Sequence, residues 1–302
     1  MDAVYDVIKD TLTIKTKMNL SLIIPACNEQ DRITQTLERF ASYFPKITKK
    51  FEMIIVVNGS KDKTLERALE FKKKHKTVKI INIPARVGKG GALISGFKKA
   101  KYDIMGFLDA DDAFELGQIM PLIDSLKNGK TDVAIASKWK SRSFSQVDEP
   151  FTRKLLSRGW NLLTRILLGL PFADTQAGAK FFTKNAWNTI THDFIGRGFE
   201  FDSDLLLRFH STGMRITEYL IPNHYREQSK FRLTHSIGMF FSLLKIALKK
   251  REQHPAYYYY AYKNWWQLTH LFYKRKIDWI LSFVPKNSTF LDAGCGSGVL
   301  AT

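Results

Sequence analysis

Residues 103–111 read Asp103-Ile104-Met105-Gly106-Phe107-Leu108-Asp109-Ala110-Asp111, a short apolar run that ends in two carboxylates. Side chains alternate along a strand, so residues two apart point to the same side. Two neighbouring carboxylates repel each other unless a cation lies beside them. Hard divalent ions such as Mg²⁺ or Mn²⁺ suit oxygen ligands and bridge them to a diphosphate. The run therefore predicts a buried strand with a metal site at its end. The alternative is a plain polar turn, since Asp is common in turns.

The segments on either side of this run alternate between apolar stretches and amphipathic ones. Their spacing predicts strands over 20–25, 53–57 and 78–83, and helices over 32–44, 62–75 and 88–99, with residues 28–31 capping the first helix. Strands that alternate with helices indicate an α/β fold with a mostly parallel sheet flanked by helices. Ligands of such sheets lie beyond the carboxyl ends of the strands. Residues 25–29, 58–60 and 109–111 are therefore expected to converge there.

The second half of the chain continues the pattern around a polar loop at 138–152. The same criteria predict helices over 116–127, 153–169, 202–209 and 234–251, and strands over 132–137, 180–183 and 215–221. An aromatic-rich helical region is expected over 256–285, followed by a new strand that begins at Thr289.

The composition narrows the class of protein. The chain has 302 residues, of which 44% are hydrophobic and 25% charged, as is typical of a globular protein. Its formal net charge of +18 predicts an anionic partner, which is nucleic acid, an anionic membrane surface or a phosphorylated substrate. A solvated, lysine-rich surface explains part of this excess.

The cysteine count and the hydropathy pattern predict the cellular compartment of the protein. Only two cysteines are present, Cys27 and Cys295, so a disulfide framework or a Cys-rich zinc site is excluded and a reducing compartment fits. Residues 1–17 lack the pattern of a signal peptide. No apolar run reaches the roughly 18–20 residues that span a bilayer. We expect a cytoplasmic protein without a transmembrane helix.

Several motifs in residues 20–230 together resemble family 2 glycosyltransferases with the GT-A fold. The similarity is greatest to the dolichyl- and polyprenyl-phosphate glucosyl- and mannosyltransferases. The motifs that carry the resemblance are Ile24-Pro25-Ala26-Cys27-Asn28-Glu29, Val57-Asn58-Gly59-Ser60-Lys61-Asp62-Lys63-Thr64, Gly88-Lys89-Gly90-Gly91, Leu108-Asp109-Ala110-Asp111, Asp174-Thr175-Gln176-Ala177-Gly178-Ala179-Lys180, Phe199-Glu200-Phe201-Asp202 and Tyr225-Arg226-Glu227-Gln228-Ser229-Lys230.

The resemblance implies roles for individual residues. The residues that would bind the nucleotide sugar are Pro25, Asn28, Glu29, Asn58, Lys89 and Asp109. Asp111, with Asp109, would bind Mg²⁺ or Mn²⁺, and Asp202 would orient a cation or the sugar as a third catalytic residue. The alternatives are helix capping for Glu29, a solvated position for Lys89 and a structural helix N-terminus for Asp202.

Two positions depart from the family pattern. Val57 and Asn58 stand where many members carry a second acidic pair, although Asn still hydrogen-bonds a base or ribose. Ala113 stands where many mannosyl-type members carry a glutamine, which favours the glucosyl branch. The Asp174-Thr175-Gln176 segment favours the same branch.

The implied chemistry needs cations on both substrates. A divalent ion neutralises the leaving diphosphate as a Lewis acid. A hydroxyl acceptor usually needs a carboxylate base. A polyprenyl monophosphate does not, because its second pKa is about 6. The candidate cations for the acceptor phosphate are Lys138, Arg142, Arg153, Arg226 and Lys230. Solvated surface charge is the alternative for these side chains.

Two segments indicate contact with a membrane. In residues 153–169 and 234–251, apolar side chains alternate with lysine and arginine. Basic amphipathic helices lie in membrane interfaces and are attracted to anionic lipid. We expect a peripheral protein on the cytoplasmic membrane face. The alternative is that these apolar faces pack on the sheet.

The end of the chain carries a second resemblance. A strand followed by Asp292, Gly294, Gly296 and Gly298 is similar to the first motif of class I S-adenosylmethionine-dependent methyltransferases. The chain stops at Thr302, so we expect a truncated, inactive start of such a domain. The expected organisation is a lead over 1–17, a GT-A domain over 18–252, and a helical linker with the truncated domain over 253–302.

The function expected from the sequence is metal-dependent, inverting transfer of a hexose. UDP-glucose is the favoured donor and GDP-mannose the other, and the acceptor is dolichyl or polyprenyl phosphate. One alternative is a polysaccharide or protein-linked glycan acceptor. Another is a sugar-1-phosphate nucleotidyltransferase, but its glycine-rich basic loop is replaced by residues 25–29. A non-enzymatic binder of nucleic acid or anionic surfaces is the third. No nucleic-acid motif is present, so no nucleic-acid partner is expected.

Overall fold

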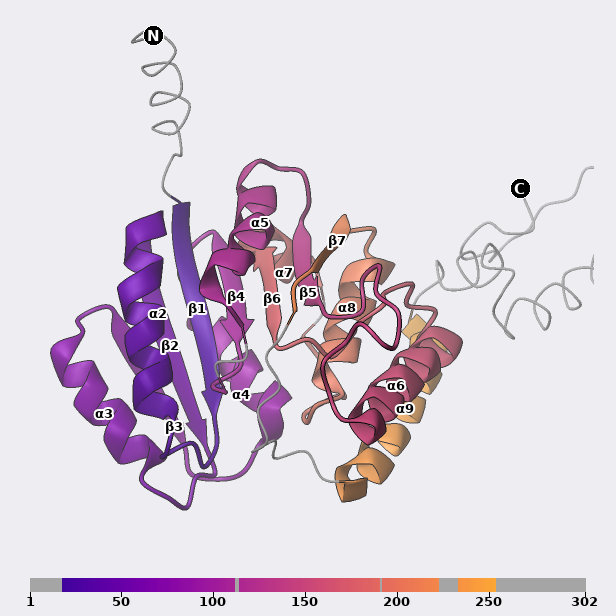
Figure 1. The fold of residues 1–302 in the computed structure, drawn as a ribbon, viewed down its shortest axis with the longest axis horizontal. Helices are drawn as coiled ribbons and strands as arrows, with labels where there is room; N and C mark the ends of the chain where they lie inside the picture. The colour runs from indigo at the N-terminus through magenta and orange to yellow at the C-terminus, as the bar shows by residue number, and fades with distance from the viewer. Residues whose placement is uncertain (1–17, 112–113, 191, 223–232, 254–302) are drawn as a thin grey trace, which may run out of the picture.

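A seven-stranded sheet forms the centre of the protein in a computed structural model that describes residues 18–111, 114–190, 192–222 and 233–253 (Figure 1). The strand order is β3-β2-β1-β4-β6-β5-β7. The strands are β1 (Met18–Ala26), β2 (Thr48–Asn58), β3 (Val78–Ile83), β4 (Ile104–Leu108), β5 (Val133–Ser137), β6 (Ala179–Thr183) and β7 (Ile216–Leu220).

One strand of the sheet runs against all the others. β6 is antiparallel to both β4 and β5, whereas every other pair of neighbours is parallel. In the β4–β6 register Leu108 lies opposite Ala179, so the start of β6 lies beside the end of β4. The segment that enters β6 is thereby brought to the edge where the parallel strands end. The mostly parallel α/β sheet expected from the sequence is confirmed.

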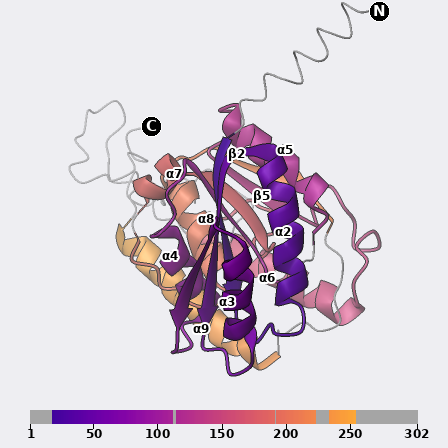
Figure 2. The same ribbon diagram turned by 90° about the vertical axis from the view of Figure 1, so that its left-hand side faces the viewer.

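Helices cover both faces of this sheet (Figure 2). Their bounds are α2 (Ile33–Ile47), α3 (Thr64–Lys74), α4 (Gly88–Phe97), α5 (Leu116–Lys127), α6 (Phe151–Leu168), α7 (Lys184–Thr189), α8 (Phe201–Ser211) and α9 (Leu233–Gln253). Consecutive residues of β1 belong to different cores: Leu22 and Ile24 pack with α2, α3 and α5, and Ile23 packs with α4, α7 and α8. The strict alternation of a strand thus places one apolar layer on each face.

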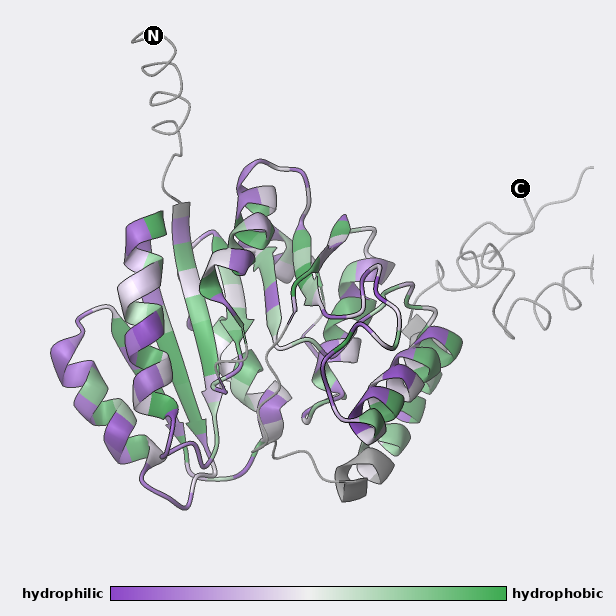
Figure 3. Cartoon of the chain, in the orientation of Figure 1, coloured by the Kyte–Doolittle hydropathy of each residue, from purple (hydrophilic) through white to green (hydrophobic). Residues whose placement is uncertain are grey.

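The two helices α6 and α9 lie side by side at one end of the molecule (Figure 1). In Figure 3 the strands are largely hydrophobic, whereas α6 and α9 carry hydrophobic and hydrophilic bands together. Leu168 of α6 and Leu243 and Ile246 of α9 join the core. Each helix therefore has one face on the protein and a second face turned outward. No helix in the described part of the chain is long and apolar enough to cross a bilayer.

The predicted elements within the described residues are present, most of them with small shifts at their ends, but β2 begins five residues before the predicted strand and α7 was not predicted. The predicted cap of the first helix is wrong. α2 begins at Ile33 after Arg32, and no side chain caps it. Instead, Asn28 adopts a positive φ of 54° and its Oδ1 accepts a hydrogen bond from Lys61 N at 2.8 Å. The side chain of Asn28 is thus bonded to the next loop, and the start of α2 is satisfied by a backbone carbonyl instead, since Glu29 O accepts from Ile33 N at 2.8 Å. The regions predicted over 256–285 and from Thr289 lie outside the described residues.

Candidate active site

The first part of the site is a pair of loops at the carboxyl ends of β1 and β2. Glu29 N donates to Thr64 Oγ1 at 2.6 Å, and Asn28 N donates to Ser60 Oγ at 3.1 Å. Asn58, the last residue of β2, is buried, and its Nδ2 donates to Ala26 O at 3.4 Å. These contacts hold the two loops against each other. Pro25, one residue before the end of β1, lies at the same edge, opposite Val56 of β2.

Two carboxylates follow β4 at the same edge. The Asp109 backbone N donates to Gly178 O at 3.0 Å, which fixes this residue against the segment that enters β6. Asp111 differs from it, because its Oδ1 is buried and has no hydrogen-bond partner among the described residues. An orphaned buried carboxylate oxygen is costly unless a cation or donor reaches it. This atom therefore fits the hard-cation site that the sequence predicts.

A buried ionic network connects Asp109 to the interior. Lys89 Nζ, in the first turn of α4, lies 2.9 Å from Asp109 Oδ1 and 3.1 Å from Asp202 Oδ2. Asp202 Oδ1 in turn accepts from Lys180 Nζ of β6 at 2.6 Å. The Asp202 side chain is 0% exposed and that of Lys180 is 1% exposed. Lys89, predicted to face the donor phosphates, is thus held between two carboxylates.

The electrostatics of this cluster are set by an excess of carboxylates. Burial raises the pKa of Asp109 to about 6, with Lys89 opposing this and the charges of Asp111 and Asp202 adding to it. The pKa of Lys89 is raised above its ordinary value, because the two carboxylates it bridges outweigh the effect of burial. Burial lowers the pKa of Lys180 despite its pairing with Asp202. Three carboxylates facing two ammonium groups favour the approach of another cation.

Arg32 adds a positive charge near the two carboxylates. Its Nε is hydrogen-bonded to Glu29 Oε2, and the charges of Asp111 and Asp109 also raise its pKa, against the effect of burial. Glu29 therefore has a partner for its side chain as well as one for its backbone. Arg32 was not among the site residues predicted from the sequence, although its place three residues after Glu29 on the same turn was a usable signal.

The predicted acceptor cations lie partly together, after β5. Lys138 Nζ donates to both carboxylate oxygens of Glu149 at 2.8 and 2.7 Å. Arg153 Nε lies 3.6 Å from Glu149 Oε1, and the Arg142 carbonyl accepts from Arg158 at 3.0 Å. Lys138 and Arg153 thus share a buried carboxylate that was not predicted as a site residue. Arg226 and Lys230 lie outside the described residues.

The helix α6 is fastened to the segment that enters β6. Asn161 Oδ1 accepts from both Thr175 N at 3.0 Å and Thr175 Oγ1 at 3.1 Å, and both residues are buried. Three residues further on, Gly178 packs against Asp109. The position of α6 is therefore coupled through a short stretch of chain to the carboxylates at the end of β4.

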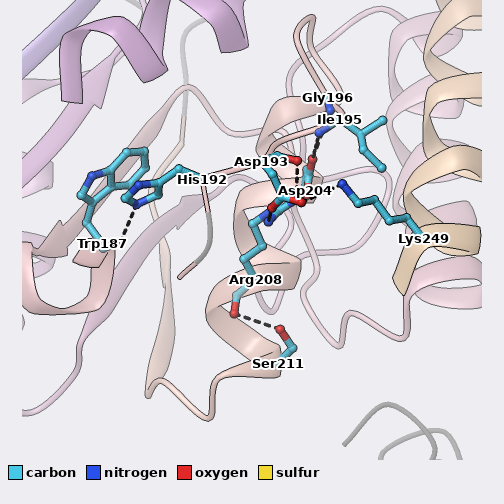
Figure 4. A network of polar contacts seen from close by, with 9 residues as sticks. All are labelled: Trp187, His192, Asp193, Ile195, Gly196, Asp204, Arg208, Ser211 and Lys249. Atoms are coloured by element: carbon cyan, nitrogen blue, oxygen red, sulfur yellow. Dashed lines mark hydrogen bonds and ion pairs between the residues drawn. The ribbon is translucent and has the colours of Figure 1, made fainter. Parts of the chain in front are cut away.

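A second polar network fastens the loop that precedes α8 (Figure 4). Asp204 Oδ2 accepts from Ile195 N and Gly196 N at 2.9 and 3.1 Å, and Arg208 bridges Asp204 and Asp193. Lys249 of α9 lies 2.7 Å from Asp193 Oδ2. The same loop accepts from α4 through the carbonyls of 197 and 198, so it holds the turn that carries Lys89.

The fold is of the GT-A type, a mostly parallel sheet with helices on both faces. Among solved structures, a glucosyl-3-phosphoglycerate synthase of Mycobacterium tuberculosis superposes with a TM-score of 0.55 at 18% identity, over 76% of this chain and 78% of that one. A mannosyl-3-phosphoglycerate synthase of Rubrobacter xylanophilus gives 0.58 at 15% identity, over 78% and 74%. At such identities the likeness shows the fold.

The family follows from the sequence comparison. Residues 21–206 match the profile of Glycosyl transferase family 2, and the chain belongs to this family. A dolichyl-phosphate beta-glucosyltransferase of Trichomonas vaginalis is 30% identical over 240 residues, which are 77% of this chain and 74% of the relative. An undecaprenyl-phosphate mannosyltransferase of Micrococcus luteus is 28% identical over 224 residues, 73% of this chain and 89% of that one. The protein is a glycosyltransferase similar to polyprenyl-phosphate sugar transferases.

The methyltransferase-like end has no counterpart in these findings. Asp292, Gly294, Gly296 and Gly298 lie outside both the family match and the described residues. That motif, like the division at residues 17 and 252, stays a prediction.

Proposed function

We propose that this glycosyltransferase uses a divalent metal ion to move a hexose from a nucleotide diphosphate sugar to a polyprenyl or dolichyl monophosphate, with inversion. The observation that supports a metal site is Asp111 Oδ1, which is buried without a hydrogen-bond partner among the described residues, in a cluster where carboxylates outnumber ammonium groups. The relatives named as dolichyl- and undecaprenyl-phosphate transferases support the acceptor class. The mycobacterial synthase was solved in complex with Mn²⁺ and UDP, which supports the cofactor and donor classes.

The donor half of the proposed site lies over β1, β2 and β4. Pro25, Asn28, Glu29 and Asn58 would line the nucleotide pocket, because their strands end at one edge. Asp111 would hold Mg²⁺ or Mn²⁺, with Asp109 beside it facing the nucleotide. The ion, when bound, would neutralise the leaving diphosphate. UDP-glucose is the proposed donor, with GDP-mannose as the alternative.

The acceptor half lies over β5 and α6. A phosphate monoester is largely ionised near neutral pH, so no general base has to activate it. Lys138, Arg142 and Arg153 are proposed to balance its charge, with Arg226 and Lys230 as further candidates outside the described residues. Since Glu149 already accepts from Lys138, the acceptor phosphate would have to share Lys138 with this carboxylate or displace the carboxylate from it.

The outer faces of α6 and α9 are proposed to contact the membrane that carries the acceptor. Their exposed apolar side chains are between 36% and 66% accessible: Phe151, Leu155, Leu156, Leu162, Phe240, Phe241 and Leu248. The sequence of α6 contains lysine and arginine but no acidic residue. Apolar side chains among basic ones suit a surface of anionic lipid. Peripheral attachment at this face would place the acceptor beside α6.

Sugar transfer into lipid tests the proposed reaction. Purified protein, a polyprenyl phosphate and Mg²⁺ or Mn²⁺ are given radiolabelled UDP-glucose or GDP-mannose, and label is counted in the butanol extract. We expect metal-dependent label that is lost in Asp111→Asn and kept in Asp103→Asn, which changes an exposed carboxylate at the other end of β4. If folded protein transferred label to lipid from neither donor, the proposed lipid acceptor would be rejected, and glycan acceptors would be tested next.

Vesicle sedimentation tests the proposed membrane face. Burying one large apolar side chain contributes about 1.5–3 kcal/mol, so Leu155→Glu and Phe241→Glu should each reduce binding to phosphatidylglycerol vesicles roughly tenfold or more. Leu69→Glu, at an exposed leucine of α3, is the matched control. Equal losses in all three variants, or no binding by the unaltered protein, would remove this face from the proposal.

A further inference from the structure

The ionic network behind Asp109 is a chain of four alternating charges from four different elements. It runs from Lys180 of β6 to Asp202 of α8, then to Lys89 of α4 and to Asp109 after β4. The side chain of Lys89 is 10% exposed, and those of Asp202 and Lys180 are buried. Buried charges persist only when they are paired and hydrogen-bonded. The ionic network therefore fixes each of its four side chains, and Lys89 is not a solvated lysine.

The backbone around Lys89 is equally constrained. Gly90 N donates to Gly198 O at 3.3 Å, and Gly91 N donates to Arg197 O at 3.2 Å. A Cβ on Gly90 would lie 2.5 Å from Phe201 Cβ, so glycine lets α4 approach α8 closely. This close approach brings Lys89 between the carboxylates of two elements.

The ammonium of Lys89 covers both oxygens of Asp109. Its Nζ lies 2.9 Å from Oδ1 and 3.1 Å from Oδ2. Both oxygens of Asp109 are therefore engaged by an ammonium group and would not both be free for a metal ion. Asp111 Oδ1, in contrast, has no hydrogen-bond partner among the described residues. Arg32 acts on Asp111 through its charge, but its Nε is hydrogen-bonded to Glu29. The two carboxylates of one motif therefore differ: Asp109 is paired with Lys89 through both of its oxygens, whereas one oxygen of Asp111 is left for an external cation.

We propose that Lys89, held by Asp202 and Lys180, is a positioning residue that serves as the permanent counter-cation of Asp109, so that the divalent ion binds at Asp111 and only together with the donor diphosphate. This inference rests on the proposed function and goes further, since it gives an order of binding. Mg²⁺ is commonly held by one or two carboxylates plus substrate phosphates, and a single carboxylate binds it weakly. Asp202 then acts on the site through Lys89 and does not touch the sugar.

The binding of Mn²⁺ to the full chain, followed by electron paramagnetic resonance, tests this proposal without any sugar transfer. Mn²⁺ is titrated with and without UDP, and separately with GDP. We expect nucleotide to tighten Mn²⁺ binding at least tenfold. Loss of an outer-shell partner costs roughly 10–100-fold in metal affinity, so Asp111→Asn, which removes a ligand, should weaken the nucleotide-assisted affinity at least that much, whereas Asp109→Asn should change it less than about threefold.

Lys89→Met should strengthen Mn²⁺ binding, whereas Asp111→Asn should weaken it. Once its counter-cation is removed, Asp109 becomes a second ligand, and Mn²⁺ affinity without nucleotide should rise roughly tenfold or more. Lys99→Met, an exposed lysine just beyond α4, is the matched control and should change nothing. If Lys89→Met does not fold, the comparison of Asp109→Asn with Asp111→Asn decides by itself.

The proposal is overturned if Asp109→Asn weakens Mn²⁺ binding as much as Asp111→Asn does, or if Mn²⁺ binds equally well without nucleotide. These results do not depend on an acceptor. A failure of sugar transfer with the expected Mn²⁺ data would reject the proposed acceptor and leave the counter-cation role standing.

Discussion

A methyl group added at Gly178 should disable the site while leaving the fold intact. Gly178 lies two residues before Lys180, in the segment that enters β6, and its carbonyl accepts from Asp109 N. A Cβ on this residue would lie 2.2 Å from Asp109 Oδ2 and 2.7 Å from its Cγ, whereas ordinary contact begins near 3.4 Å. Gly178→Ala therefore forces the carboxylate to move by about 1 Å from the place where it pairs with Lys89.

The size of the effect follows from this displacement. Misplacing a functional group by about 1 Å costs on the order of 100-fold in rate. Because the clash meets a side chain that is partly exposed, the stability cost should be at the low end of the roughly 1–3 kcal/mol of overpacking. A change of that size lowers the Tm by only a few degrees, at about 2–4 °C per kcal/mol.

The assay measures kcat/KM for sugar transfer to polyprenyl phosphate alongside the Tm of each variant. Gly159→Ala is the control, since a Cβ on this residue of α6 meets nothing within 4 Å. If Gly178→Ala kept its activity within about threefold of the unaltered protein, the position of the Asp109 carboxylate would not matter, and the reasoning would be refuted.

Three further predictions concern stability. Lys180→Met breaks a buried ion pair and should cost about 3–5 kcal/mol in unfolding free energy, with a Tm lower by roughly 6 °C or more; an unchanged Tm would contradict this. Gly106→Ala places a Cβ 2.1 Å from Phe181 Cδ1 inside the sheet and should cost about 1–3 kcal/mol in a urea titration. Burial raises the pKa of Asp174, so its ionised form is destabilising once the pH exceeds the ordinary value of 3.8. The stability of Asp174→Asn relative to the unaltered protein should therefore increase from pH 4 to 7, and a flat difference would refute the assignment.

The secondary structure could be predicted because its signals are local. Alternation of apolar residues marks a strand and a period of 3.6 marks a helix, whatever the rest of the chain does. The strand before Asp109 and the helix that begins at Gly88 were found in this way. The side-chain cap expected at residues 28–31 is absent because Asn28 bonds the neighbouring loop, while the first turn of α2 donates to the backbone carbonyl of Glu29.

The partners of the charged side chains could not be predicted. Lys138 and Arg153 were expected to be available to an acceptor. In the structure, the loop between them places the Glu149 carboxylate in contact with both side chains. Lys180 stands within an apolar strand, which was a signal that its ammonium must have a buried partner. The amino-acid sequence around Lys180 does not reveal that this partner is Asp202.

The sequence by itself determined the alternation of strands and helices, the carboxylates at the end of β4 and the family to which the chain belongs. Only the tertiary structure decided that β6 runs antiparallel, and that Lys89 and Lys180 lie on either side of Asp202. The physical reason is that hydrophobic periodicity is a property of neighbours along the chain. The pairing of buried charges depends instead on which distant segments the folded sheet and helices bring within hydrogen-bond distance.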